Sequence, residues 1–330
     1  MKRSGEERRL KGSLQMNLGS KMPNFTSTSE FLLLQFSDIR EVQILYSFIF
    51  LIVYLTAVTG NLLIILAVAL DHHLHTPMYF FLMNLAILDI GLISVTLPKT
   101  MANSLMNRRS ISYLGCVAQV FFLFQFIGAD FAILTVMAHD RYVAICNPLQ
   151  YEIIMHRGAC IQMAASAWIA GIFDGMLQTG GTFAITFCSN MIDQFFCEIP
   201  QMLKLSCTDL YLVEVGLMIL TLFFVLGCFI FIIVSYVRIF EAVLKIPSVH
   251  GQKKAISTCL PHLTVVSLLT FTGIFAYLRP QSYISSDLNV LSAIIYAIIP
   301  PLLNPFIYSM RNKEIKTALL KLFDLGSILK

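Results

Sequence analysis

The stretch MAHDRYVAIC, residues Met137–Cys146, places an aspartate and an arginine at the end of a long apolar run. At a membrane boundary, an adjacent acid and base partly neutralise each other, and a neighbouring helix or a partner can compete for the arginine. Asp140 and Arg141 are therefore either parts of a switch or simply the polar end of a transmembrane helix. The rest of the chain has to distinguish these two interpretations.

The composition of the chain indicates a membrane protein. Of the 330 residues, 57% are hydrophobic and only 13% are charged, which argues against two soluble domains. The net charge is only +4, and no long run of like charge follows the first dozen residues, so we expect no nucleic-acid partner. The eight cysteines form no CxxC or Cys/His pattern, so we expect no metal site and no cofactor.

Seven stretches are long and apolar enough to cross a bilayer, which takes about 20 helical residues. They predict an all-α membrane protein: a seven-transmembrane helix bundle over residues 42–310 with a short amphipathic C-terminal helix. The predicted membrane helices are about 42–70, 77–103, 112–146, 157–180, 210–240, 252–278 and 288–310. Residues 1–41 form an N-terminal tail, with 1–21 disordered, and 311–330 form the C-terminal tail. Basic and apolar residues alternate in that second tail, which favours a helix lying on anionic membrane lipid.

The orientation of the bundle follows from the cysteines more clearly than from the charges. Lysine and arginine are almost evenly divided between the two sides unless residues 1–21 are set aside, and then the N-terminus is predicted to be outside. Cys188, Cys197 and Cys207 cluster in one loop, and disulfides form on the extracellular side. With Cys116, four cysteines allow three pairings.

The N-terminal tail is predicted to be extracellular. It contains no apolar core followed by a small-residue cleavage site, so we expect the first span to act as its own insertion signal. Asn24, in the sequon Asn24-Phe25-Thr26, is then a predicted glycan acceptor. Met1, Met16 and Met22 all remain possible starts.

Four polar side chains lie inside four different predicted spans: Asn61, Asp89, Asp130 and Asn304. A buried carboxylate in a membrane is costly unless it has partners. The four residues either form a shared polar site for a small cation such as sodium, or hold helices together by hydrogen bonds. Pro305 removes one helix hydrogen bond and predicts a hinge in the last span.

One face of the third span connects an apolar group to the arginine. Phe124, Ile127, Gly128 and Phe131 recur at the three- and four-residue spacing of a helix face, which continues down to Arg141. A cavity lined by these upper residues lies about 20 Å from the arginine at about 1.5 Å per residue. The alternative is that this face simply packs against the bundle.

An ordered series of motifs runs from about Asn24 to Leu322. It comprises Gly60-Asn61, LHTPMYFFL at 74–82, LAILD at 85–89, MAHDRYVAIC with NPLQY at 137–151, FFCE at 195–198, Ser235-Tyr236, KAISTCLPH at 254–262 and PLLNPFIYSMRN at 301–312. Taken together, these motifs closely resemble the olfactory receptors of the rhodopsin-like G-protein-coupled receptor family.

This resemblance implies the disulfides Cys116–Cys197 and Cys188–Cys207. It also implies an odorant pocket between the third, fifth, sixth and seventh helices, beneath the outer loop. The implied pocket residues are Leu123, Phe124, Ile127, Gly128, Glu198, Leu220, Phe224, Gly273, Ile274, Tyr277, Ile294 and Ala297. Such a lining suits a small hydrophobic volatile, with Tyr277 or Glu198 supplying a hydrogen bond.

The resemblance further implies signalling through a stimulatory, olfactory-type heterotrimeric G protein that raises cyclic AMP, from a plasma-membrane location. The residues implied in coupling are Asp140, Arg141, Tyr142, Tyr236, Asn304, Pro305 and Tyr308. Two positions depart from the family pattern. His139 replaces the tyrosine before the aspartate, and Thr270 replaces an aromatic residue that is expected to sense the ligand.

Other function classes fit the sequence less well. An amine-type chemoreceptor needs an acid near Leu123, where the chain is apolar. A multipass transporter or channel commonly shows internal repeats, and we find none between the two halves. An enzyme is not expected, because no nucleophile and base stand at a usable spacing.

Overall fold

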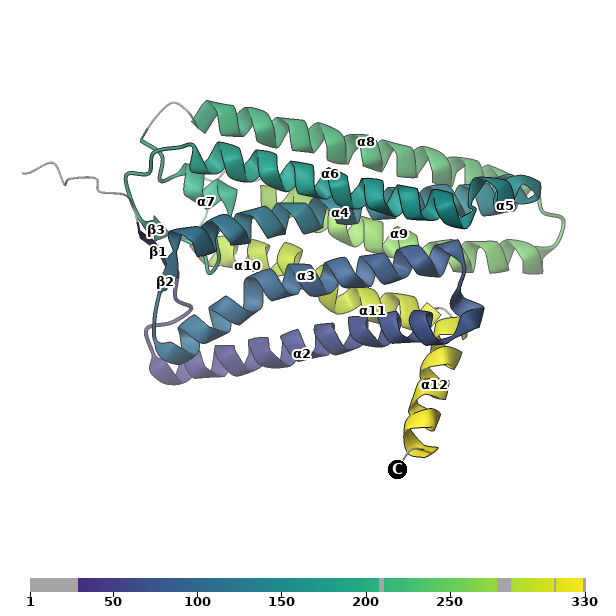
Figure 1. Cartoon of the computed structure of the whole chain (residues 1–330), viewed down its shortest axis with the longest axis horizontal. Helices are drawn as coiled ribbons and strands as arrows, with labels where there is room; N and C mark the ends of the chain where they lie inside the picture. The colour runs from purple at the N-terminus through teal and green to yellow at the C-terminus, as the bar shows by residue number, and fades with distance from the viewer. Residues whose placement is uncertain (1–28, 208–210, 278–285, 312, 329–330) are drawn as a thin grey trace, which may run out of the picture.

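A computed structural model describes residues 29–207, 211–277, 286–311 and 313–328. In this part of the chain, seven helical segments are long and apolar enough to cross a membrane, which confirms the predicted fold. Figure 1 shows them side by side as one elongated bundle. Asn24 and the three candidate start methionines lie outside the described residues.

The bundle helices follow the apolar stretches of the sequence. They are α2 (Arg40–Leu70), α3 (Pro77–Met106), α4 (Tyr113–Cys146), α6 (Arg157–Phe183), α8 (Tyr211–Leu244), α9 (Val249–Tyr277), α10 (Ser286–Ala297) and α11 (Ile299–Arg311). Short elements connect them: η1 (His72–Leu74), η2 (Pro148–Gln150), α5 (Tyr151–Ile154) and α7 (Ile199–Leu203). Helix α8 is longer than expected, since it ends at Leu244 rather than near 240.

The last span is two helices rather than one. Helix α10 ends at Ala297 and α11 begins at Ile299, just before the pair Pro300 and Pro301. A proline has no backbone N–H to donate to the preceding turn, so two in succession interrupt the helix. The predicted hinge proline, Pro305, lies inside α11.

The structure contains a small three-stranded sheet, which the predicted all-α fold did not include. Strand β1 (Glu30–Leu33) pairs antiparallel with β2 (Ser110–Ser112) and parallel with β3 (Met191–Ile192). Phe31 and Leu33 of β1 are buried, and Phe31 stacks on Tyr113. The segment before the first span is therefore not all free tail, because residues 30–33 pair with two loops of the bundle.

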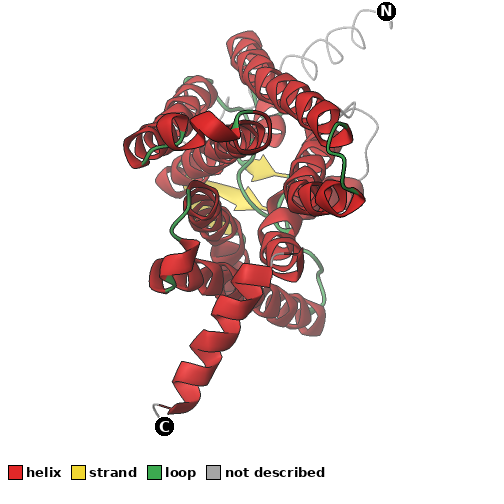
Figure 2. Ribbon diagram, turned by 90° about the vertical axis from the view of Figure 1, so that its right-hand side faces the viewer, coloured by secondary structure: helices red, strands yellow, loops and turns green. Residues whose placement is uncertain are grey.

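The two ends of the bundle differ. We call the end with the strands and the disulfides the outer end, and the opposite end the inner end, because disulfides form on the extracellular side. Helix α12 (Lys313–Ile328) leaves the inner end and turns away from the bundle axis (Figures 1 and 2). This is the predicted short C-terminal helix.

Helices α4 and α6 are packed close enough that their backbones almost touch. A Cβ atom on Gly171 would lie 2.3 Å from the carbonyl oxygen of Gln125, and one on Gly175 would lie 2.8 Å from that of Phe121. Small residues four apart allow this approach and the dispersion contacts that hold membrane helices together. Helix α4 is thereby fixed to α6 along its middle.

Candidate functional site

The outer end is closed by a loop that two disulfides hold. Cys197 is bonded to Cys116 at the start of α4, and Cys188 is bonded to Cys207 within the loop. These are the two pairs that the family resemblance implies. The backbone N–H of Cys197 also donates to the Gln119 side chain at 3.1 Å, so the loop is tied to α4 at neighbouring points.

Glu198 is used to fasten this loop. Its carboxylate is buried and accepts hydrogen bonds from Tyr296 Oη of α10 at 2.8 Å and from Gln194 Nε2 at 3.4 Å. Burial raises the pKa of Glu198, while these hydrogen bonds and nearby Lys204 lower it less. The residue expected to bond an odorant therefore already bonds the last span.

Five of the twelve predicted pocket residues gather beneath this loop. Leu123 and Phe124 of α4 and Ala297 of α10 are buried in the outer core, and Ile127 and Ile294 pack against the same core. Phe195 and Phe196 of the loop cover it from outside and are also buried. These side chains form one buried apolar cluster of α4, α10 and the loop.

The remaining pocket residues are placed differently. Leu220, Phe224 and Ile274 have exposed fractions of 54%, 37% and 48%, so they do not join the buried group. Beyond the nearby backbone of its own helix, no atom of the described residues lies within 4 Å of the place that a Cβ on Gly273 would take. Gly128 faces α6, since its Cβ would lie 3.4 Å from Asp174 Oδ2. The side chain of Tyr277 lies outside the described residues.

A polar cluster between α6 and α8 was missing from the predicted pocket. Gln178 donates to the carbonyl of Leu217 at 3.0 Å and to Thr221 at 2.8 Å, and Thr221 in turn donates to Asp174. One turn further out, Thr182 donates to Glu214 at 3.0 Å. The only sequence signal was an acid or amide in an apolar span.

Two acceptor atoms of this cluster have no hydrogen-bond partner among the described residues. They are Glu214 Oε2 and Gln178 Oε1, on side chains that are almost completely buried. A buried acceptor without a donor is costly. The cluster can therefore accept a hydrogen bond from a ligand that reaches the α4, α6 and α8 junction.

Three of the four predicted intramembrane polar residues meet around α11. Asn304 Nδ2 donates to both carboxylate oxygens of Asp89, at 3.1 and 2.9 Å. Asn61 Nδ2 donates to the carbonyl of Pro301 at 3.0 Å. This carbonyl has no partner in its own helix, because Pro305, four residues later, lacks an N–H. The turn of α11 that contains Pro305 is thus bonded to α2 and α3.

Asp130 completes this group. It lies close enough to Asp89 for their charges to interact, and its Oδ1 has no hydrogen-bond partner in the described part of the chain. The same is true of Asn61 Oδ1, Asn304 Oδ1 and Tyr308 Oη, all of them buried oxygens. Oxygen atoms of this kind are the ligands that a hard cation takes.

At the inner end, Asp140 is held by Tyr151, which was quoted as part of a motif but was given no role. Tyr151 Oη of α5 donates to Asp140 Oδ1 at 2.7 Å. Burial and the neighbouring carboxylate raise the pKa of Tyr151, so it keeps the proton that it donates. The guanidinium of Arg141 contacts the sulfur of Met78 on α3. Tyr142 packs half-buried against the inner core.

A histidine links three helices next to this arginine. His262 Nε2 lies 2.9 Å from the carbonyl of Leu134 on α4, and its Nδ1 lies 2.9 Å from Tyr236 Oη on α8. A carbonyl only accepts, so Nε2 carries the proton and Tyr236 donates to Nδ1. His262 was quoted as part of a motif, but its role as the connection of α9 to α4 and α8 was missed.

The two residues that depart from the family pattern have different surroundings. The ring of His139 lies 6.3 Å from that of Phe231 on α8. Thr270 on α9 has a buried hydroxyl with no partner among the described residues. At position 270 a small polar group therefore stands where the family pattern leads us to expect an aromatic ring.

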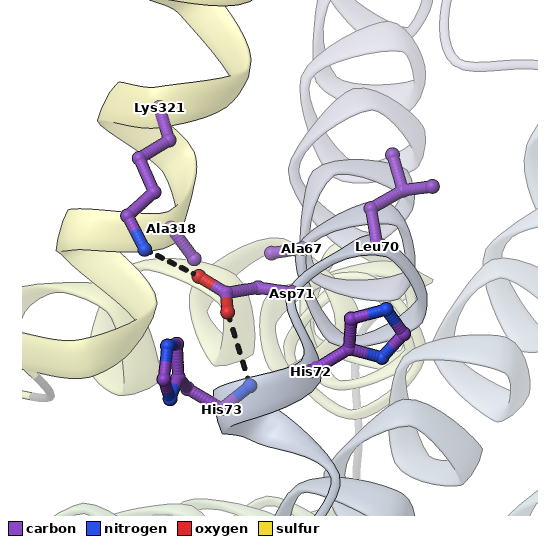
Figure 3. Close-up of a pocket in the computed structure, with 7 residues that line it drawn as sticks. All are labelled: Ala67, Leu70, Asp71, His72, His73, Ala318 and Lys321. Atoms are coloured by element: carbon purple, nitrogen blue, oxygen red, sulfur yellow. Dashed lines mark hydrogen bonds and ion pairs between the residues drawn. The ribbon is translucent and has the colours of Figure 1, made fainter.

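Helix α12 is seated by two polar contacts at the inner end. Tyr79 Oη donates to Glu314 Oε2 at 2.6 Å, and Lys321 Nζ lies 3.0 Å from Asp71 Oδ2. Figure 3 shows the second contact, with Lys321 reaching across to the loop after α2. In the described residues, no group of three or more His, Cys, Asp or Glu side chains could hold a metal ion.

Comparisons with known proteins agree with this geometry. The family model described as olfactory receptor matches residues 50–325. The chain is 50% identical to olfactory receptor 14A16 of Homo sapiens over 90% of its length and 96% of that protein's, and 50% identical to olfactory receptor 14I1 of Homo sapiens over 92% and 97%. The crystal structure of squid rhodopsin superimposes with a TM-score of 0.70 at 15% identity, covering 91% of this chain and 92% of that one.

The rhodopsin likeness supports the fold, and the family model and the relatives give the family. The chain therefore belongs to the olfactory receptor family, and it is a multi-pass plasma-membrane signalling receptor rather than an enzyme.

Proposed function

We propose that the chain is an odorant receptor that binds small hydrophobic volatiles inside the helix bundle and activates a stimulatory, olfactory-type G protein to raise cyclic AMP. The observation that carries this proposal is the placement of two groups of residues at opposite ends of α4. Its outer half contributes Leu123 and Phe124 to a buried apolar wall, and its inner end carries Asp140 and Arg141. One continuous helix therefore spans both the candidate ligand site and the candidate coupling site.

The chemistry of the wall sets the ligand class. Leu123, Phe124 and Ala297 offer no polar side-chain atom, so a neutral apolar body is favoured. One hydrogen bond from the odorant can be accepted by the cluster of Gln178 and Glu214, whose unpaired oxygens are buried nearby. This role replaces the one expected of Glu198.

The inner end supplies the coupling step. Arg141 contacts Met78, and His262 holds α9 to α4 and α8. When α9 moves outward, the Tyr236–His262 contact separates and the guanidinium becomes available to the G protein. Tyr142, Asn304, Pro305 and Tyr308 belong to the same proposal, as the residues that shape this end.

The intramembrane polar group is proposed as a sodium site. Asp89, Asp130, Asn61 and Asn304 carry several buried oxygens without partners, and a cation between the two carboxylates offsets their repulsion. Sodium bound there stabilises the inactive packing of α3, α4 and α11. Dissociation of the ion on activation then lets α11 move.

The test is a cyclic AMP assay in cells that express the receptor, with a panel of volatile compounds. A cognate odorant should raise cyclic AMP, and Arg141→Ala should abolish the response while surface delivery remains measurable. Arg157→Ala is the matched control, because Arg157 is an exposed arginine at the same end of the bundle. A response that survives Arg141→Ala contradicts the coupling role, and odorant-gated ion flux without a G protein supports a channel instead.

A further inference from the structure

A cavity lies at the inner end, between the end of α2 and helix α12. It has a volume of about 300 Å³ and is drawn in Figure 3. Its lining is Ala67, Leu70, Asp71, His72, His73, Ala318 and Lys321. None of these residues belongs to the odorant site or to the coupling site described above.

The lining divides into an apolar part and a polar part. Ala67 and Leu70 belong to the last turns of a membrane-spanning helix, and Leu70 is exposed. The polar residues follow directly, in the loop and on α12. The cavity is therefore at the boundary between the hydrocarbon of the membrane and its inner surface. At this boundary, the apolar part of an amphipathic molecule meets apolar residues and its polar part meets polar ones.

The polar part offers hydrogen-bond donors to an anion. The carboxylate of Asp71 is bonded to Lys321 Nζ and to the backbone N–H of His73, and these contacts lower its pKa. Its negative charge is thus balanced by Lys321, whose ammonium keeps further N–H donors. In Figure 3, Lys321 and His73 lie on one side of Asp71, and His72 points toward Leu70 on the other.

Helix α12 adds positive charge around this cavity. Lys313 and Lys316 are exposed on its surface, outside the cavity lining. Basic residues immediately inside a transmembrane helix attract anionic lipid of the inner leaflet. A lipid phosphate is thus attracted to α12 by charge, and at the cavity it can accept hydrogen bonds from N–H donors.

We propose that this cavity binds the phosphate headgroup of an anionic inner-leaflet phospholipid. Lys321 Nζ and the His73 imidazole donate to the phosphate oxygens, and the acyl chains lie against the exposed side chain of Leu70. The lipid joins α2 to α12 and holds the C-terminal helix at the membrane surface. The strength of this attachment therefore depends on the lipid composition of the membrane.

The experiment measures lipid retained by the full-length purified receptor. The receptor is reconstituted in nanodiscs of phosphatidylcholine with phosphatidic acid, extracted in mild detergent, and examined by native mass spectrometry. We expect retained phosphatidic acid in preference to phosphatidylcholine, and a loss of about tenfold in Lys321→Gln and in His73→Gln, as for a hydrogen bond to a charged group. Lys316→Gln is the comparison variant on the same helix and should lose clearly less lipid than Lys321→Gln, because it removes one surface charge and no donor of the cavity.

A second variant separates lipid binding from the ion pair alone. Asp71→Asn removes the carboxylate that competes for Lys321, so it should increase retained phosphatidic acid. If the cavity residues only fasten α12, Asp71→Asn lowers retention instead, and that result overturns the proposal. Equal loss in Lys316→Gln and Lys321→Gln, or displacement of the lipid by inorganic phosphate alone, also contradicts a lipid site at this cavity.

Discussion

The outer and inner ends of the bundle are held by different kinds of bond. At the outer end, two disulfides and the ladder hydrogen bonds of three strands fix the loop to α4 and to the segment before α2. At the inner end, the helices are joined by single side-chain contacts such as Tyr151 to Asp140 and Tyr236 to His262.

This difference teaches where the molecule can move. A disulfide does not open when a ligand binds, whereas one side-chain hydrogen bond contributes about 0.5–3 kcal/mol and can be exchanged for another. A ligand bound beneath the outer loop therefore meets a fixed frame. The free energy of binding can shift only the weaker contacts, and these lie at the inner end.

The largest expected effect comes from opening the outer frame. Changing Cys116 and Cys197 together to Ser removes a crosslink that spans 81 residues, which corresponds to about 4.5 kcal/mol in the chain-entropy model. We expect a strong fall in surface expression and in the melting temperature of the solubilised receptor. The Cys188 and Cys207 pair, separated by 19 residues, should cost less when changed in the same way. An unchanged melting temperature in the first variant would show that the outer end is not held covalently.

The second prediction concerns the helix pair that joins the two ends. Gly171→Ala places a methyl group against the Gln125 carbonyl, so α4 and α6 must separate, at a cost of about 1–3 kcal/mol. Gly180→Ala on the same helix is the control, because no other part of the described chain comes within 4 Å of its Cβ position. Thermal unfolding of the two variants should differ clearly. If both variants melt alike, the close packing of α4 and α6 does not stabilise the bundle.

The third prediction tests the weak inner end. Tyr151→Phe removes the donor to Asp140, a hydrogen bond to a charged group worth about 1.5–3 kcal/mol. Basal signalling should rise about tenfold, while the melting temperature changes little, because the outer frame is untouched. Tyr46→Phe, on the outer half of α2, is the control. Unchanged basal signalling in Tyr151→Phe would mean that this contact does not restrain activation.

The smallest effect is a pH dependence of the outer end. The pKa of Glu198 is raised above its ordinary value of 4.5 by burial, so the folded receptor binds the proton more tightly than the unfolded chain does. The free energy of unfolding should therefore fall as pH rises from 4.5 through the raised pKa. Melting temperatures of the solubilised receptor, measured from pH 4.5 upward, report this slope. Glu198→Gln should flatten it, and a slope of the opposite sign would contradict the burial argument.

The seven-helix fold could be predicted because each span is a long apolar stretch with few charges. The strand at Glu30–Leu33 could not be, since its partners lie in loops that are distant in the sequence. A strand of this kind has no local signal beyond the alternation of Phe31 and Leu33.

The pocket was less predictable than the fold, for a reason that α8 makes clear. In a membrane, residues that face lipid and residues that face the core are both apolar, so the period of hydrophobicity does not identify the inner face. Only 6% of the most apolar part of α8 is buried. Leu220 and Phe224 therefore look like core residues in the sequence, and only the rotation of the helix shows that they are exposed.

The hydrogen bond between Asn61 and the Pro301 carbonyl determines the order in which Asn61 and Pro305 are best substituted. Losing Asn61 first leaves a buried carbonyl without a donor, at a cost of about 1–3 kcal/mol. Replacing Pro305 first restores a backbone N–H that can bond the same carbonyl, so the stability of the fold then depends less on Asn61. For stability alone, this pair of positions therefore changes at lower cost in one order, the proline before the asparagine.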